Sequence, residues 1–324
     1  MQPDQATNVA VAAFELAFCR RPASHELAAF TAALRGDIAT SDALLHRLLA
    51  LRGEPVAPEY AELDQLLESP STSALLTGHG LDRKTYETAY ATLIQRSEAL
   101  VVGQDTYLPQ HKERFWELFQ ACGHLLTQRT NPRLLEFGSS EFSVLYKRFF
   151  PNAAVHLSDR PTPPDYIGFT EALARQKLAC DDYFAIDLEQ VDSLPTGGPV
   201  PGSYDLILLC EVLEHLVVNP VDLLRALLAL LKPDGRLYLT TPNLFRAENQ
   251  RKWIVGENPQ AVYPTRNQNW DRHHHHREYG AAELLRFIRA AGGRALAFYY
   301  SDCWDRDTSV APNQRSNLVF LVSC

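Results

Sequence analysis

From Pro132 to the carboxyl terminus, short apolar runs alternate with stretches of helix length, and no other feature restricts the fold as strongly. Runs rich in branched and aromatic residues predict strands at 133–137, 154–158, 183–187, 204–210, 236–241, 295–300 and 317–323. Helices are expected in the connections near 141–150, 168–179, 220–232 and 280–292. Buried strands joined by helices predict an α/β fold with a doubly wound, mostly parallel seven-stranded sheet. No helix separates the last two runs, so the last strand should be antiparallel.

The residues before this alternation show helical periodicity and no strand pattern. We therefore expect a helical N-terminal region over 1–128 and a second domain over 129–324. A small helical module is expected over 1–52, and the prolines in 53–64 predict a linker after it. Two further amphipathic helices are predicted at 83–100 and 110–127. The helical region is also where we expect contacts between two copies of the chain.

Charge and cysteine usage exclude several classes of protein. The formal net charge is −8, which argues against a nucleic-acid partner because such proteins present a basic face to phosphates. The six cysteines form no C-x-x-C pair, and a reducing, cytoplasmic location fits them best. The N-terminal MQPDQATN shows no features of a signal peptide, and no apolar run approaches the ~20 residues needed to span a bilayer.

Acidic residues follow four successive predicted strands, at Glu136, Asp159, Asp187 and Glu211. In a doubly wound sheet the ligand binds beyond the carboxyl ends of the strands, so we expect these carboxylates to line one cleft. Such a cleft suits a cationic ligand that carries a ribose diol. A dinucleotide fits less well, because the first turn has Gly138 alone and not the G-x-G-x-x-G pattern that holds a pyrophosphate.

The segments LLEFGSS, HLSD, AIDLEQ, YDLILLCEVLEHL and LLKPDGRLYLTTPN form a series along the chain. This series resembles the class I methyltransferases that use S-adenosylmethionine. The resemblance covers about residues 131–324 and is most specific in EVLEHL and LKPDGRLYLTTPN. It implies a Rossmann-like domain, methyltransferase activity and S-adenosylmethionine as the cofactor.

The same resemblance implies a role for each residue of the expected cleft. The residues implied at the methionine end of the cofactor are Glu136, Phe137, Gly138 and Ser139. Asp159 is implied at the ribose, and Asp187 with Leu188 is implied at the adenine. Glu211 is implied at the end of the pocket. One departure affects the first turn, where the family often has further glycines and this chain has Ser140 and Phe142. The approach to the cofactor carboxylate is therefore expected to differ.

The N-terminal stretch AFELAFCRRPASHELAAFTAALRGD is similar to small helical modules that contain L-x-R-x-P-x-x-x-E-L. Those modules accompany methyltransferases and glycosyltransferases of bacterial surface-polysaccharide clusters. The resemblance spans only about 40 residues. It implies glycan biosynthesis, with a sugar or glycan O-methyltransferase as the corresponding enzyme.

Four consecutive histidines in DRHHHHREY (271–279) lie between the fifth predicted strand and the helix near 280–292, where related folds place acceptor-binding insertions. A sugar hydroxyl is a poor nucleophile at neutral pH and needs a base or a metal ion before it can accept a methyl group. We therefore expect a histidine general base, with His215, His274 and His275 as candidates. The alternative that the histidine run, which includes His273, forms only a polar lid stays open.

A divalent metal ion is a second interpretation of these residues. The pattern E-x-x-E-H, with a downstream histidine before an acidic-aromatic pair, resembles the small-RNA 3′-terminal 2′-O-methyltransferases, which use such a metal. The implied ligands are Glu211, Glu214, His215 and His276, and the implied ion is Mg²⁺ or Mn²⁺. The alternative is that EVLEHL is a structural signature, as in many relatives without a metal.

Aromatic side chains alternate with amides and arginines in the expected insertion over 242–279. Aromatic rings stack on the C–H faces of sugars and amides bond to sugar hydroxyls, although an RNA end would suit them too. The candidate acceptor-binding residues are Trp253, Tyr263, Trp270 and Arg272. Alternatively these aromatics pack the insertion onto the sheet. Glu278 and Tyr279 could in the same way only begin the next helix, whose positive end favours an acid.

The sequence thus predicts an S-adenosylmethionine-dependent O-methyltransferase that acts on a hydroxyl of a sugar, a glycan or a related metabolite with a histidine base. We expect a small-molecule or glycan acceptor as its partner. Two alternatives stay open. One is a metal-dependent RNA 2′-O-methyltransferase, against which the net acidity counts. The other is a non-catalytic scaffold with a degenerate methyltransferase domain.

Overall fold

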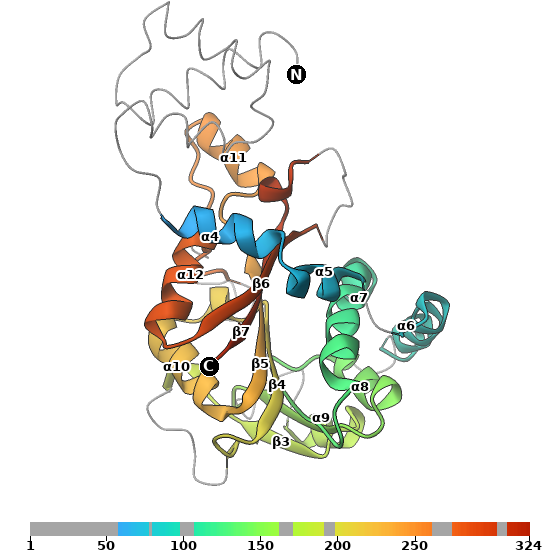
Figure 1. The fold of residues 1–324 in the computed structure, drawn as a ribbon. Helices are drawn as coiled ribbons and strands as arrows, with labels where there is room; N and C mark the ends of the chain where they lie inside the picture. The colour runs from blue at the N-terminus through green and yellow to red at the C-terminus, as the bar shows by residue number, and fades with distance from the viewer. Residues whose placement is uncertain are drawn as a thin grey trace, which may run out of the picture.

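A computed structural model of the chain describes residues 58–77, 80–97, 107–161, 171–190, 198–260, 274–302 and 310–324. Its centre is one seven-stranded sheet with the order β3-β2-β1-β4-β5-β7-β6 (Figure 1). The strands are β1 (Arg133–Phe137), β2 (Ala154–Asp159), β3 (Asp182–Ala185), β4 (Tyr204–Cys210), β5 (Leu231–Pro242), β6 (Arg294–Ser301) and β7 (Asn317–Ser323). Strand β7 runs antiparallel between β5 and β6, and the other pairs are parallel. The predicted fold class, the seven strands and the reversed last strand are confirmed.

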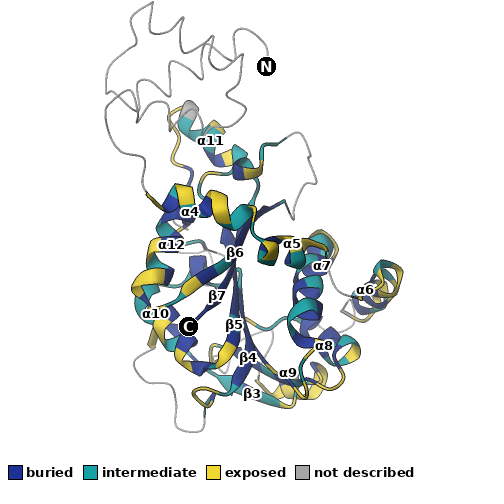
Figure 2. Cartoon of the chain, viewed as in Figure 1, coloured by how far each residue is buried: buried dark blue, intermediate teal, exposed yellow. Residues whose placement is uncertain are grey.

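Helices cover both faces of the sheet. One face packs against α7 (Tyr107–Leu126), α8 (Val144–Phe149) and α9 (Glu171–Lys177), and α6 (Arg83–Ser97) packs on the outer side of α7. The other packs against α4 (Pro58–Leu67), α10 (Pro220–Leu230) and α12 (Ala281–Ala290). Two shorter helices are α5 (Pro70–Thr77) and α11 (Ala247–Ile254), and four 3-10 turns are η1 (Glu141–Ser143), η2 (Leu188–Gln190), η3 (Leu213–His215) and η4 (Pro312–Gln314). Figure 2 shows the strands buried and the exposed residues gathered on the outer sides of the helices.

Strand β4 shows why the predicted runs are apolar throughout. Successive side chains of a strand point to opposite faces of the sheet, and here both faces are covered. Leu206 and Leu208 enter the core beneath α7, whereas Ile207 and Leu209 enter the core beneath α10 and α12. All four are fully buried, so an alternating polar pattern would have placed polar groups in a core.

The prediction of a linker over 53–64 is wrong from Pro58 onward, because α4 begins there and α5 begins at Pro70. A proline at the first position of a helix loses no hydrogen bond and already has a helical φ, so these prolines mark helix starts. The helices also protect the sheet edge. The buried Thr72 hydroxyl accepts from Phe298 N–H on the edge strand β6 (3.0 Å) and donates to the Leu66 carbonyl (2.7 Å).

The helix α7 belongs physically to the sheet domain, since Phe119 and Cys122 are fully buried against it. The boundary expected after residue 128 stays a prediction. The expected module over 1–52 lies outside the described residues. No helix in the described ranges has both the length and the apolar character that a membrane crossing requires.

Candidate active site

The four strand-end acids lie on neighbouring strands at the carboxyl edge of the sheet. Glu136 is in β1, Asp159 ends β2, Asp187 lies two residues after β3, and Glu211 directly follows β4. Because β3, β2, β1 and β4 are adjacent and parallel, the four backbone positions line one edge, as the sequence predicts. Their side chains, however, differ in what they contact.

Glu136 points into the protein interior. One carboxylate oxygen accepts from the Tyr146 hydroxyl (2.8 Å) and the other from the Ser143 hydroxyl. Burial raises the pKa of Glu136 to about 7, although these two hydrogen bonds act in the opposite direction. The carboxylate therefore fixes the turn between β1 and α8, and it also contributes to the wall of a cavity.

Gly138 makes the turn after β1 possible. Its φ is +79°, in the left-handed region that favours glycine, and an added Cβ would lie 2.5 Å from Cγ2 of Val212. The Gly138 N–H donates to the Ser158 carbonyl (2.9 Å), which ties the turn to β2. The close approach to Val212 joins this turn to the segment after β4.

Asp159 and Asp187 differ in the hydrogen bonds that their carboxylates accept from neighbouring residues. The Asp159 carboxylate accepts from the adjoining Arg160 N–H (2.8 Å) at the tip of β2. Asp187 accepts from Glu189 N–H (3.0 Å) and from the Gln190 amide (2.8 Å), so it caps the turn η2. The remaining residues expected to bind the cofactor lie beside them: Phe137 and Leu188 are buried, and Ser139 is part of the turn after β1.

A cavity lies between α7, the carboxyl ends of β1, β4, β5 and β6, and the amino end of β7, and its empty volume, which includes space open to solvent, is about 500 Å³. Its polar wall includes Arg114, Glu117, Glu136, Ser140, Thr240 and Ser301. Glu117 accepts from the Ser301 hydroxyl (2.5 Å), and burial raises the pKa of Glu117. The cavity therefore runs from the first turn across to the antiparallel strands.

Arg114 on α7 is a site residue that the sequence reading missed. Its guanidinium is 3.9 Å from the Glu211 carboxylate, and both side chains are about one-tenth exposed. Glu211 also accepts from the Thr240 hydroxyl (2.7 Å) and has a φ of +55°, a conformation that costs a non-glycine residue about 1–2 kcal/mol. The available signal was a pair of charged residues, Arg114 and Glu117, beside the apolar face of a helix.

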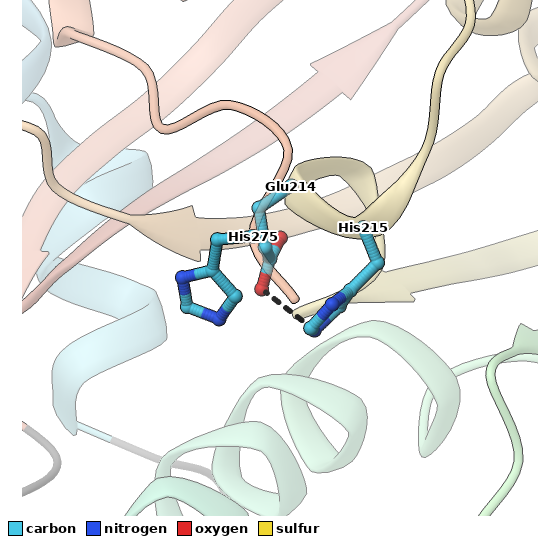
Figure 3. A group of neighbouring side chains, drawn as sticks. All are labelled: Glu214, His215 and His275. Atoms are coloured by element: carbon cyan, nitrogen blue, oxygen red, sulfur yellow. Dashed lines mark ion pairs between the residues drawn. The ribbon is translucent and has the colours of Figure 1, made fainter. Parts of the chain in front are cut away.

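Glu214, His215 and His275 form a compact cluster at the same edge, and their ligand atoms all lie within 4.8 Å of one another. Figure 3 shows the three side chains converging from two separate segments. Glu214 is 1% exposed; one oxygen accepts from the Thr241 hydroxyl (3.0 Å). Among the described residues the other oxygen has no hydrogen-bond partner, and it lies 3.9 Å from His215 Nε2. Burial, reinforced by the nearby Glu211 carboxylate, raises the pKa of Glu214 well above its ordinary value.

The backbone fixes the orientation of His215. Its Nδ1 lies 2.9 Å from the His274 carbonyl, which can only accept a hydrogen bond, so Nδ1 carries the proton and Nε2 carries the lone pair. In neutral His215 this lone pair faces the buried oxygen of Glu214. The cluster is not part of the cavity lining. The two are linked electrostatically, because Arg114 on the cavity wall and Glu211 both act on the pKa of Glu214, which Arg114 lowers and Glu211 raises.

Alternate histidines of the run point their side chains in different directions. His275 joins the cluster, with its ring centroid 4.8 Å from that of His215. The rings of His274 and His276 instead lie 4.9 Å apart against each other, and the His276 N–H donates to the Glu214 carbonyl (2.7 Å). Neighbouring side chains of an extended segment point in opposite directions. The cluster therefore does not include His274, His276 or Glu211, and the roles expected for these three residues stay predictions.

The acceptor-binding candidates are only partly described. Trp253 on α11 is half-buried and packs against Phe245, with ring centroids 5.4 Å apart. The other candidates, Tyr263, Trp270 and Arg272, lie outside the described residues, as does His273. The contribution of these residues to acceptor binding stays a prediction.

The chain is similar to known methyltransferases. Residues 110–295, more than half of the chain, match a family model described as a methyltransferase domain. A ubiquinone biosynthesis O-methyltransferase of Xanthomonas euvesicatoria is 38% identical over 92 residues, which cover 28% of this chain and 36% of that protein. The enzyme of the same name from Burkholderia thailandensis is 29% identical over 124 residues, or 38% of this chain and 51% of that protein. The chain thus spans about a third to a half of the length of these relatives, and neither name mentions a sugar.

Among solved structures, an S-adenosylmethionine-dependent methyltransferase from Clostridium acetobutylicum aligns with a TM-score of 0.45 at 13% identity. The alignment covers 74% of this chain and 98% of that one.

Proposed function

This chain belongs to the methyltransferase-domain family, the class I S-adenosylmethionine-dependent methyltransferases, and from that premise we propose that it methylates a hydroxyl group of a small-molecule acceptor. The observation that carries the proposal is the convergence of Glu214, His215 and His275 beside the cavity. Methylation of a hydroxyl needs a proton acceptor, and the cluster offers an imidazole lone pair fixed in direction. Two relatives named as O-methyltransferases support the same acceptor class.

The residues at the edge fit the cofactor in charge and position. S-adenosylmethionine, when bound, supplies a methyl group on a positively charged sulfur. Glu211 and Asp159 place negative charge beside the cavity and at the neighbouring strand tip, where they would hold the sulfonium and the ribose hydroxyls. Arg114, on the cavity wall, would attract the cofactor carboxylate.

The cluster would prepare the acceptor. His215 Nε2 would take the proton of the hydroxyl, because Nδ1 already donates to the His274 carbonyl. General-base help of this kind contributes about 10²–10⁴-fold to rate. The acceptor oxygen would lie between the cluster and the cavity, which are linked through Arg114.

Fewer observations bear on which hydroxyl compound is the acceptor than on the acceptor being a hydroxyl. The N-terminal resemblance and the aromatic insertion support a sugar or glycan, whereas the names of the two relatives concern ubiquinone biosynthesis. We therefore propose a small-molecule hydroxyl as the acceptor class and keep the sugar or glycan as its narrower form. The net charge of −8 disfavours RNA.

Transfer of a labelled methyl group from S-adenosylmethionine to matched panels of hydroxyl, amine and thiol acceptors tests the proposal. We expect product with hydroxyl compounds alone. Calorimetry with S-adenosylhomocysteine is run beside it, so that failure of cofactor binding is separated from a wrong acceptor class. Labelling only of amines or thiols would contradict the proposal, because those nucleophiles need no cluster of this kind.

A divalent metal ion at the same cluster is the second candidate. It is favoured by the Glu214 oxygen that is buried without a hydrogen bond beside two imidazoles, which is the donor set expected for Mn²⁺ or Zn²⁺ more than for Mg²⁺. In that case Glu214, His215 and His275 would hold the ion, which would lower the pKa of the acceptor hydroxyl. Turnover after exhaustive chelation decides between the two candidates. Activity lost with EDTA and restored by Mn²⁺ supports the metal, and unchanged activity supports the histidine base.

A further inference from the structure

Glu278 lies directly behind the cluster and holds one of its histidines. It is 3% exposed and precedes α12. One of its carboxylate oxygens lies 3.0 Å from His275 Nδ1. The other accepts from the Asn249 amide (2.8 Å) and from the Arg246 guanidinium, both at or within α11. The carboxylate thus joins α11 to the cluster.

We propose that Glu278, fixed by Arg246 and Asn249, is a positioning residue that keeps the proton of His275 on Nδ1 and its lone pair on Nε2. The inference rests on the proposed function, because it assigns the support of the same cluster. It also gives the segment 242–279 a role beyond acceptor binding, since α11 would orient His275 through Glu278.

The argument follows from which groups can donate. Arg246 carries only donors, and the Asn249 amide nitrogen donates to Glu278 as well as to the Leu244 carbonyl (2.9 Å). A buried carboxylate paired with a guanidinium stays ionised and can only accept. His275 Nδ1 must therefore be the donor toward Glu278.

The same logic already holds for His215, whose Nδ1 faces the His274 carbonyl. Both imidazoles of the cluster would then carry their lone pairs on Nε2. Histidine ligands and bases are commonly held in this way by a carboxylate or a carbonyl behind the ring, and removing the support costs about 10–100-fold in activity or metal affinity. The arrangement would serve a general base and a metal site equally.

Replacement of Glu278 by glutamine makes a sharp prediction. Arg246 carries only donors, and the Asn249 nitrogen is held toward this position because it also donates to the Leu244 carbonyl, so both would take the amide oxygen and leave the amide nitrogen toward His275. His275 Nδ1 would then have to accept, and the proton would move to Nε2. We therefore expect Glu278→Gln to invert the tautomer of His275. A residue that served packing alone would not produce this inversion.

Long-range ¹H–¹⁵N NMR of the full-length protein at about pH 8, where an ordinary histidine is neutral, reads the tautomer directly. The His275 signals are assigned with His275→Gln. We expect the Nδ1-protonated form in the wild type and the Nε2-protonated form in Glu278→Gln. The matched control is Glu248→Gln, an exposed carboxylate of α11 that pairs with Lys252, and it should keep the wild-type tautomer. An Nε2-protonated wild type would overturn the proposal even if Glu278→Gln did not fold.

Kinetics give the second readout. We expect turnover of Glu278→Gln to fall by about 10–100-fold with unchanged affinity for S-adenosylhomocysteine, while Glu248→Gln keeps the wild-type rate. A folded Glu278→Gln with wild-type turnover and an Nδ1-protonated His275 would refute the inference and leave the proposed function standing. Absence of hydroxyl methylation in the wild type would refute the proposed function alone, because the tautomer is measured independently of activity.

Discussion

The carboxyl edge of β1–β4 and the cluster of Glu214, His215 and His275 lie side by side but are built in different ways. At the edge, parallel strands carry each acid to its position. The cluster joins segments about 60 residues apart, and it is held by backbone bonds such as the His276 N–H to the Glu214 carbonyl. Regular elements place groups along one line, whereas two loops bonded to each other can bring three ionisable groups to one point. We expect the edge to govern cofactor binding and the cluster to govern chemistry.

Glu136 is the edge residue whose carboxylate should affect folding stability more than cofactor binding, because it is turned into the protein interior. Its pKa is raised by burial from 4.5 to about 7, so the folded state holds the proton more tightly than the unfolded state. The resulting stability is complete below about pH 4.5 and is lost as the pH rises through about 7, a change of about 3 kcal/mol. Urea unfolding across this window should show the decline in the wild type and a flatter profile in Glu136→Gln. Parallel profiles would contradict this assignment.

Gly138 tests whether the edge depends on a close contact or only on backbone conformation. Gly138→Ala should destabilise the protein more than Gly256→Ala, because both have a positive φ but only at Gly138 does the new Cβ meet another residue, Val212. The φ alone costs about 1–2 kcal/mol at each site, and the contact should add about 1–3 kcal/mol at Gly138. Thermal unfolding of the two variants measures the difference. Equal losses would mean that Val212 moves aside.

Asp159 tests the binding role of the edge. We expect Asp159→Ala to weaken S-adenosylhomocysteine about 10–100-fold, the loss of one or two hydrogen bonds to a charged group, while turnover at saturating cofactor stays near wild type. Asp222→Ala, which removes an exposed acid of α10, is the control and should bind normally. Calorimetry measures the affinities, and wild-type affinity in Asp159→Ala would remove Asp159 from the cofactor site.

Thr72 should affect neither cofactor binding nor methyl transfer, so a variant at Thr72 serves as a control for both regions. Thr72→Val leaves the Phe298 N–H on β6 without its partner, and a buried unsatisfied group costs about 1–3 kcal/mol. The midpoint of urea unfolding should fall while cofactor affinity and turnover at saturation stay unchanged. A loss of turnover in this variant would show that the sheet edge at β6 is coupled to the site.

The same difference between regions explains what the sequence could predict. The seven strands and the acids at their tips follow from periodicity and position, since a parallel sheet leaves one edge for both. Arg114 was missed because its role depends on how α7 packs across that edge. The prolines of 53–64, Pro55 and Pro58, predicted a linker because a proline that begins a helix, as Pro58 does, looks in sequence like one that ends it.

Within the histidine run, alternation could predict that neighbours point in opposite directions, but not which of them faces Glu214. That choice is made by the pairing of the 274–277 backbone with η3. Glu278 was expected only to begin a helix, and its contacts with α11 arise from residues about 30 positions earlier in the chain.

The single-turnover rate of His215→Gln at saturating S-adenosylmethionine tests the central claim most directly. We predict a fall of about 10²–10⁴-fold in methyl transfer to the hydroxyl acceptor, with affinity for S-adenosylhomocysteine unchanged. His276→Gln, whose ring lies outside the cluster, is the matched control and should transfer at nearly the wild-type rate. A His215→Gln protein that folds, binds the cofactor product and transfers methyl groups at the wild-type rate would contradict the account.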